Sequence, residues 1–148
     1  MFKHILVSTD GSKLSGKAIR TAVRLAAATG ARVTGAYVMA PFMPPAYGEG
    51  VMYAQVISPA RYKQLMEKAA RKALAAVEVE AGAGSVAYAG AMVTANNPWE
   101  GIIRVARSKK CDLIVMASHG RRGLAGLVLG SETTKVLTHS KIPVLVCR

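Results

Sequence analysis

The stretch that decides the fold is residues 112–131, D-L-I-V-M-A-S-H-G-R-R-G-L-A-G-L-V-L-G-S. Residues 112–117 form a short, nearly unbroken apolar run, which is typical of a strand buried on both faces of a parallel sheet. A glycine-rich loop follows, and Ser131, with Glu132 behind it, predicts a helix whose N-cap is a hydroxyl. A strand that leads through such a loop to a helix N-terminus suits phosphate binding, because free backbone N–H groups and the helix dipole both favour an anion.

The glycines of this loop have two interpretations. They could only permit a tight crossover between strand and helix, or they could let the backbone approach a bound anion. Arg121 and Arg122 in the loop, together with the helix start at Gly130 and Ser131, favour the anion site.

Length and composition indicate one globular domain, residues 1–148, with a sizeable core, because 51% of the residues are hydrophobic. The apolar runs are shorter than the roughly 18 residues that a membrane span requires. The first ten residues lack a signal-peptide layout, since their apolar run is short and ends in an acid. We therefore expect a cytoplasmic protein with no membrane partner. Cys111 and Cys147 have neither metal-site nor disulfide-framework spacing, so we expect free thiols.

The charge is strongly positive, with 20 Lys and Arg residues against 8 acids and a net charge of +12. Such a balance favours polyanionic partners, and the alternative is a solvated surface with no such partner. The cations form no block of five or six along the sequence and have no interleaved aromatic residues. We therefore favour the solvated surface and do not expect a nucleic-acid partner.

Strand and helix patterns alternate along the chain. The expected strands are residues 3–9, 31–39, 86–93, 112–117 and 144–147, and the expected helices are 13–29, 59–81, one beginning at Pro98, and 131–140. This alternation predicts an α/β fold, a single open parallel five-stranded sheet with helices on both faces and right-handed crossovers. In the strand order 3-2-1-4-5, the first and fourth strands flank the point where ligands bind in such sheets. Asp10 and the loop of residues 117–131 follow these two strands.

Two other segments carry predictions that the structure can test. Residues 40–58 predict a long irregular connection. In the helix at 59–81, apolar residues at helical spacing predict one buried face, which consists of Tyr62, Leu65, Met66, Ala69, Ala73, Ala76 and Val77.

The segment 11–18, G-S-K-L-S-G-K-A, misses the P-loop pattern by one residue. Ala18 stands where the P-loop has the hydroxyl that holds Mg²⁺. Ser12 makes a good N-cap, which would place Gly16 and Lys17 inside the following helix. We therefore expect no P-loop here.

Two motifs resemble the universal stress protein family. The segment I-L-V-S-T-D-G-S at 5–12 is similar to its I-L-V-x-x-D-G-S motif, and Gly120, nine residues and Gly130-Ser131 match the second half of its G-x2-G-x9-G-[S/T] nucleotide loop. Ala117 departs from the first glycine of that loop, which bears on ATP binding but not on the fold. The resemblance covers essentially the whole chain. It implies a Rossmann-like fold of the adenine nucleotide alpha hydrolase type and ATP as the cofactor, alone or with Mg or Mn.

The resemblance also implies roles for individual residues. The backbone of Val38 would meet the adenine, and Asp10 would meet the ribose. Without the resemblance, the sequence around Asp10 predicts only a turn. Gly120, Gly130 and Ser131 would bind the phosphates. Arg121 and Arg122 could add charge-assisted bonds to phosphate or could be solvated.

No catalytic machinery is evident in the sequence. His119 can titrate near neutrality, but no acid or hydroxyl is evidently paired with it, and we favour a hydrogen bond that orders the loop. Positioning of phosphate alone would support at most slow ATP hydrolysis.

Three hypotheses follow from these observations. The first is an ATP-binding regulatory protein of the universal stress type. The second is a family member that binds no nucleotide and acts as a dimeric interaction module, which Ala117 supports. The third is a nucleic-acid-associated protein driven by its charge. The apolar edge strand at 144–147 also predicts a homodimer, and the resemblance implies the same.

Overall fold

The computed structural model of the chain describes residues 1–44, 57–120 and 129–148. In chain order the elements are β1 (His4–Ser8), α1 (Lys13–Thr29), β2 (Arg32–Met39), α2 (Pro59–Ala83), β3 (Tyr88–Thr94), α3 (Pro98–Ser108), β4 (Leu113–Ala117), α4 (Ser131–His139) and β5 (Val144–Cys147). The strands are parallel and lie in the order β3-β2-β1-β4-β5. The predicted fold class and strand order are therefore confirmed.

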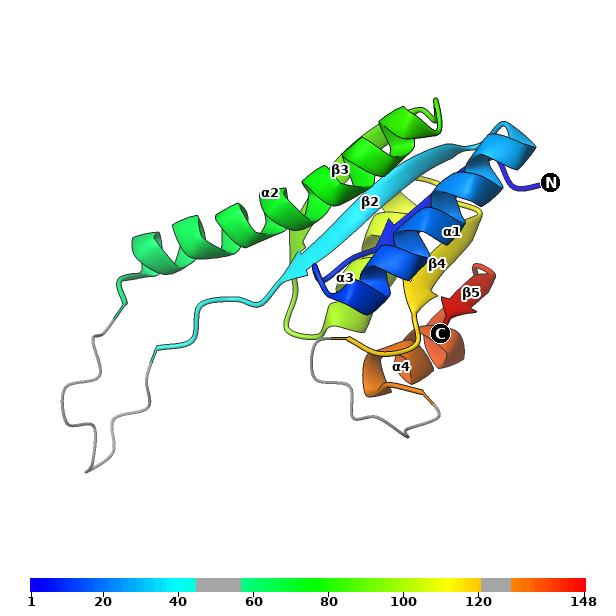
Figure 1. The fold of residues 1–148 in the computed structure, drawn as a ribbon. Coiled ribbons are helices and arrows are strands. Elements are labelled where there is room, and N and C mark those ends of the chain that lie inside the picture. Colours follow the sequence, from blue (N-terminus) through cyan, green and yellow to red (C-terminus); the bar gives the residue numbers. More distant parts are fainter. Residues whose placement is uncertain (45–56, 121–128) are drawn as a thin grey trace.

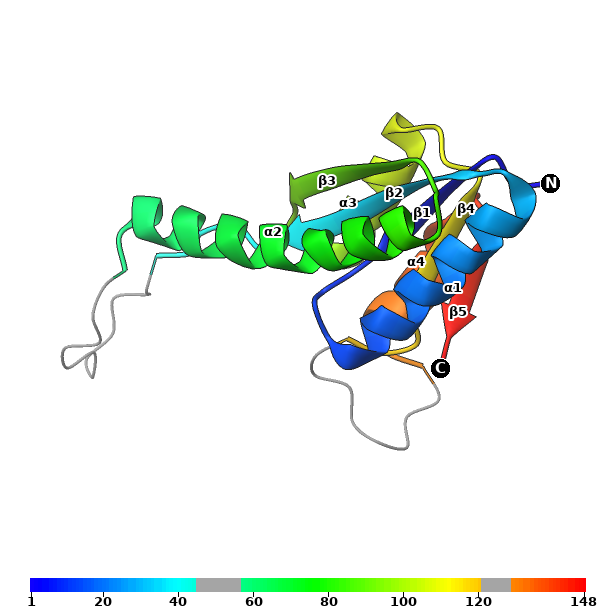
Figure 2. The same ribbon diagram turned by 45° about the horizontal axis from the view of Figure 1, so that its top comes forward.

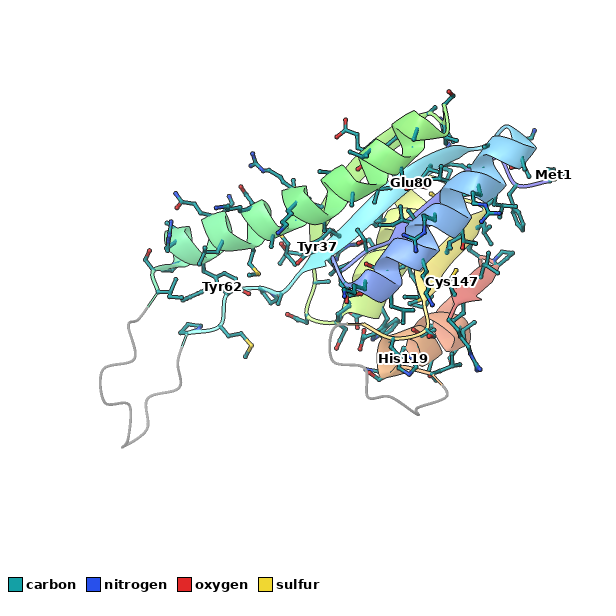
Figure 3. The ribbon with its side chains drawn as sticks, in the orientation of Figure 1. Met1, Tyr37, Tyr62, Glu80, His119 and Cys147 are labelled. Carbon is teal, nitrogen blue, oxygen red and sulfur yellow. The ribbon has the colours of Figure 1, made fainter. Side chains whose placement is uncertain are left out.

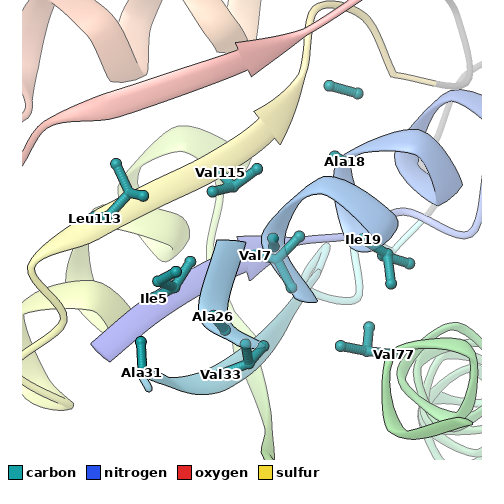
Figure 4. Packing of buried hydrophobic residues seen from close by; sticks show 12 residues of the cluster. Ile5, Val7, Ala18, Ile19, Ala26, Ala31, Val33, Val77, Leu113 and Val115 are labelled. Carbon is teal, nitrogen blue, oxygen red and sulfur yellow. The ribbon is translucent and has the colours of Figure 1, made fainter. Parts of the chain in front are cut away.

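The helices cover both faces of the sheet, with α1 and α2 on one face and α3 and α4 on the other (Figure 1; Figure 2). Alternate side chains of β1 pack against the helices on the two faces of the sheet. Ile5 and Val7 pack beneath α1 together with Val33 and Val115 (Figure 4), whereas Leu6 packs on the α3 side. These β1 side chains are fully buried, which explains why a central parallel strand has a continuous apolar sequence.

Local signals determine both ends of α1. Ser12 is the N-cap and its hydroxyl accepts the backbone N–H of Ser15 at 3.2 Å. At the other end, Gly30 adopts a left-handed conformation with φ 67° and donates its N–H to Ala26 O. Gly16 and Lys17 lie within the helix that Ser12 caps, as the sequence predicted.

The core prediction for α2 is wrong over its first half. The buried residues of α2 are Ala70, Ala73, Leu74, Val77 and Ala81. Leu65 is 38% exposed, Met66 and Ala69 are half-buried, and Ala76 is exposed. The N-terminal half of α2, which carries Tyr62, projects beyond the sheet (Figure 3). Tyr62 instead donates its hydroxyl to Ala40 O at 3.0 Å and packs its ring edge-on against Phe42.

Other differences from the sequence predictions are smaller. β3 begins at Tyr88 rather than at residue 86, and α2 ends at Ala83 rather than at residue 81. Of the connection predicted at 40–58, residues 45–56 lie outside the described residues, and the described remainder contains no helix or strand. Cys111 and Cys147 are both described and neither forms a disulfide. Among the described helices, none combines the length and apolar character needed to cross a membrane.

Candidate functional site

The candidate site lies where β1, β2 and β4 end. β1 pairs with β2 only as far as Ser8↔Ala36, whereas β2 pairs with β3 as far as Met39↔Thr94. The last three residues of β2 therefore run past the end of β1, as Figure 1 shows. We call this part of the molecule the carboxyl edge, and we define it by residues 9–10, 37–39, 117–120 and 129–131.

Val38 presents backbone groups to this edge. Along a parallel strand, the N–H and C=O of successive residues point alternately to the two neighbouring strands. Val33 donates to Ala87 on the β3 side, and Ala36 O accepts from Thr9 on the β1 side at 3.0 Å. Even-numbered residues of β2 thus face β1, so Val38 directs its N–H and C=O past the last paired residue of β1.

The side chain of Val38 is held by α3. A Cβ added to Gly101 of α3 would lie 2.7 Å from both Cγ atoms of Val38, so only glycine permits this contact. The close approach fixes the end of β2 against α3.

Asp10 begins the turn between β1 and α1. Its Oδ1 accepts the N–H of Ser12 at 2.9 Å, which is the Asx-turn arrangement. The turn also needs Gly11, whose φ is 80°. A Cβ on Gly120 would lie 3.1 Å from Asp10 Oδ2. The carboxylate of Asp10 and the backbone of Gly120 therefore lie side by side, although 110 residues separate them in sequence.

The base of the glycine-rich loop is closed by Gly130. Its N–H donates to Ser118 O at 2.8 Å, and a Cβ on Gly130 would lie only 3.1 Å from that oxygen. Gly130 is also the N-cap of α4, with no side-chain cap from the described residues. The prediction that Ser131 is the N-cap is therefore wrong. Ser131 is the first residue of α4 and is exposed.

Ala117 does not turn its methyl group to the loop. Its side chain is 8% exposed and belongs to the core cluster beneath α1, with Val7 and Ala18. Its carbonyl accepts the hydroxyl of Thr133 at 3.0 Å, and Ser118 O accepts the same hydroxyl at 3.2 Å. Thr133 thereby fastens α4 to the end of β4. Sequence reasoning missed it, because a hydroxyl in a first helical turn has an ordinary explanation as a cap.

His119 has a hydroxyl partner that the sequence analysis did not find. Its Nδ1 lies 3.1 Å from Ser118 Oγ, and the Ser118 side chain is 3% exposed. This hydroxyl ties the His119 ring to the end of β4. The His119 Nε2 is buried and has no hydrogen-bond partner among the described residues.

The structure gathers most of the predicted site residues at the carboxyl edge, namely Asp10, Val38, Ala117, His119, Gly120, Gly130 and Ser131. Arg121 and Arg122 lie outside the described residues. The resolved pKa shifts belong to groups at the opposite ends of the strands. There, burial lowers the pKa of His4 and raises that of Tyr88.

The whole chain, residues 1–148, matches the profile of the Universal stress protein family. The chain belongs to this family. A universal stress protein of Thermus aquaticus is 33% identical over 149 residues, which cover 100% of both chains.

Solved structures agree with this assignment. A universal stress protein family member from Burkholderia pseudomallei is 28% identical with a TM-score of 0.75, covering 97% of this chain and 94% of its own. A universal stress protein in complex with cAMP is 27% identical with a TM-score of 0.68, covering 99% of this chain and 97% of its own. The family resemblance seen in the sequence is thus confirmed.

Proposed function

We propose that this universal stress protein is a cytoplasmic regulatory protein of the stress response that binds ATP at its carboxyl edge and has no catalytic machinery of its own. The observation that carries the proposal is the overhang of β2 beyond β1. It leaves the N–H and C=O of Val38 directed toward space next to Asp10. One donor beside one acceptor complements the mixed donor and acceptor edge of adenine.

The rest of the nucleotide follows the edge toward α4. Asp10 Oδ2 beside Gly120 would accept hydroxyls of the ribose. The phosphates would meet the backbone of Gly120 and Gly130, the hydroxyl of Ser131 and the N-terminus of α4, where unsatisfied N–H groups and the helix dipole favour anions. A Cβ at Gly120 or Gly130 would crowd Asp10 Oδ2 or Ser118 O, each at 3.1 Å, so a side chain at either position would disturb this part of the edge.

Ala117 is compatible with this proposal, because its methyl group is buried in the core beneath α1. The described residues contain no group of three His, Cys, Asp or Glu side chains that could hold a metal ion. An accompanying Mg or Mn ion would therefore be coordinated mainly by phosphate oxygens and water, as is usual for Mg²⁺ bound with nucleotides. The relative solved with cAMP binds an adenine nucleotide, which also supports this class of ligand.

Calorimetric titration of the nucleotide-stripped protein with Mg-ATP tests the proposal. We expect saturable binding of one ATP per chain. Gly120→Ala should weaken binding at least about tenfold, or ~1.4 kcal/mol, because its methyl group would lie 3.1 Å from Asp10 Oδ2. Gly82→Ala is the matched control, since a Cβ at Gly82 meets nothing within 4 Å. If the folded wild-type protein gives no binding, the interaction module that binds no nucleotide becomes the better hypothesis.

We also propose that the protein forms a homodimer through β5. This strand lies at the end of the sheet and pairs only with β4 among the described strands. Leu145 on it is 37% exposed, and an apolar edge strand favours pairing with a second copy. Sedimentation across micromolar concentrations should give a dimer, and Leu145→Lys should shift it toward monomer. A wild-type monomer throughout would contradict the proposal.

A further inference from the structure

The outer side of α1 carries a ridge of four cations, Lys13, Lys17, Arg20 and Arg24, which we call the α1 ridge. With 3.6 residues per turn, these four positions fall within an arc of about 60°. All four residues are exposed. The opposite side of the helix carries its buried residues, which are Ser15, Ala18, Ile19, Ala22, Val23 and Ala26. The α1 ridge therefore points directly away from the core.

The cations of the α1 ridge have no acidic neighbour on their own helix. α1 contains no acidic residue. Among the described residues, Glu67 pairs with Lys63 and Arg71 on α2, and Glu132 pairs with Lys135 on α4. No salt bridge between described residues includes a member of the α1 ridge. A row of unneutralised cations attracts anions, and the absence of paired acids leaves its full charge available.

The neighbouring helix also carries exposed charges. α2 lies beside α1 on the same face of the sheet (Figure 2), and its exposed residues include Lys68 and Lys72 as well as the acid Glu78. In both ribbon views, no described segment covers the outer side of α1 (Figure 1; Figure 2). The surface is therefore open to a large partner.

The spacing of the α1 ridge suits a linear polyanion. The first and last of its four cations, Lys13 and Arg24, are eleven positions apart, which is about 16 Å at ~1.5 Å per residue. A nucleic-acid duplex carries a negative charge about every 1.7 Å along its axis, so this length of duplex offers several phosphates to each cation. The side chains of α1 do not suit two other kinds of binding, which are insertion into a membrane and stacking on single-stranded bases. α1 has no exposed large apolar side chain to insert into a membrane and no aromatic residue for stacking on single-stranded bases.

We propose that the α1 ridge binds the phosphate backbone of double-stranded nucleic acid without reading its sequence. This role does not depend on ATP. A solvated surface was favoured because the cations are dispersed along the chain. In the structure, four of them lie exposed on the side of α1 opposite its buried residues, and this exposed row changes the interpretation.

The test is the salt dependence of binding, measured by fluorescence anisotropy of a labelled mixed-sequence duplex DNA. We compare the wild type with Lys17→Gln/Arg20→Gln/Arg24→Gln, which keeps Lys13 because it lies next to the nucleotide site. The control is Arg107→Gln/Lys109→Gln/Lys141→Gln, which removes the same charge from exposed positions outside α1 and α2. Both variants should fold, because every replaced side chain is exposed and glutamine has nearly the same helix propensity as Lys and Arg at the positions within α1 and α3.

We expect the wild type to bind the duplex with a log–log slope against salt near −3.6 or steeper, because each phosphate contact contributes about −0.9. The ridge variant should lose about 2.7 of that slope, and the control should retain it. Equal losses in the two variants would overturn the proposal, because net charge rather than the α1 ridge would then drive binding. Absence of duplex binding, or preferential binding to phosphatidylserine vesicles, would overturn it as well.

Discussion

The two ends of the strands are built differently. At the amino ends, which we call the amino edge, the Asp112 carboxylate accepts the backbone N–H groups of Lys3 and His4 at 2.8 and 3.0 Å, so side chains complete the hydrogen bonding of the strands. At the carboxyl edge, the backbone of Val38 points past the end of β1, and Gly120 and Gly130 lie close to Asp10 and Ser118. Side-chain hydrogen bonds thus complete one end of this sheet, whereas at the other end β2 runs past its pairing with β1.

The amino edge is also where the environment alters the pKa values of side chains. Burial, and to a smaller extent the Asp112 charge, raises the pKa of Cys111 to about 11. Burial acts to raise the pKa of Asp112, but the N–H groups of Lys3 and His4 outweigh it and lower the pKa. His4 Nε2 lies 2.8 Å from Thr34 Oγ1 within the core. These contacts are internal, which is consistent with a structural role.

The largest effect should come from breaking the carboxyl edge with Gly130→Asp. We expect ATP affinity to fall at least about hundredfold, or ~2.7 kcal/mol. A Cβ there would lie 3.1 Å from Ser118 O, and the added carboxylate would repel the phosphates. Gly82→Asp is the control, since a Cβ at that position meets nothing within 4 Å. Calorimetry with Mg-ATP measures the affinity and circular dichroism verifies the fold. Equal affinities in the two variants would place ATP elsewhere.

The next effect should come from breaking the amino edge with Asp112→Ala. The variant leaves two backbone N–H groups without their acceptor, and hydrogen bonds to a charged group contribute about 1.5–3 kcal/mol each when protected from water. Because Asp112 is partly solvated, we expect a total loss of about 2 kcal/mol in the free energy of unfolding, measured with urea. Asp112→Asn retains an acceptor and should lose less. A change in ATP affinity as large as the change in stability would contradict the separation of the two edges.

Some of this architecture was predictable from local sequence, because it depends on local physics. Ser12 begins α1 through the hydrogen bond of its side chain, and Gly30 ends it through its positive φ. Unbroken apolar runs identify the central strands. Leu65 and Met66 show the limit of such reasoning. Their spacing is the same as that of buried residues further along α2, but a period does not reveal that the sheet ends before the helix does.

The site was predictable only in part for the same reason. The resemblance pointed to Val38, but the reason its backbone is accessible is the unequal pairing of β2 with β1 and β3, which is a property of three strands. Ser131 was predicted as N-cap because a hydroxyl is the common choice. The contact of Gly130 with Ser118 O, which joins residues on opposite sides of the loop, places the cap one residue earlier.

A smaller effect should appear in the pH dependence of stability, through His4 at the amino edge. Burial, and then the positive charge of Arg32, lowers the pKa of His4, so the folded protein binds this proton less readily than the unfolded chain. The stabilisation is present above the unfolded pKa of about 6.5 and is lost as pH falls toward the folded pKa. We expect up to about 1 kcal/mol of lost stability between pH 7 and 5.5 that His4→Gln does not show. Parallel pH profiles of the two proteins would contradict this assignment.

The most direct test of the difference between the edges is an amide NMR titration of the protein with Mg-ATP. We expect large shifts at the carboxyl edge, for Val38, Gly120, Gly130 and Ser131, and unchanged signals at the amino edge, for Lys3, His4 and Asp112. Shifts confined to the amino edge, or spread evenly over both, would contradict the claim that the overhang of β2 creates the nucleotide site.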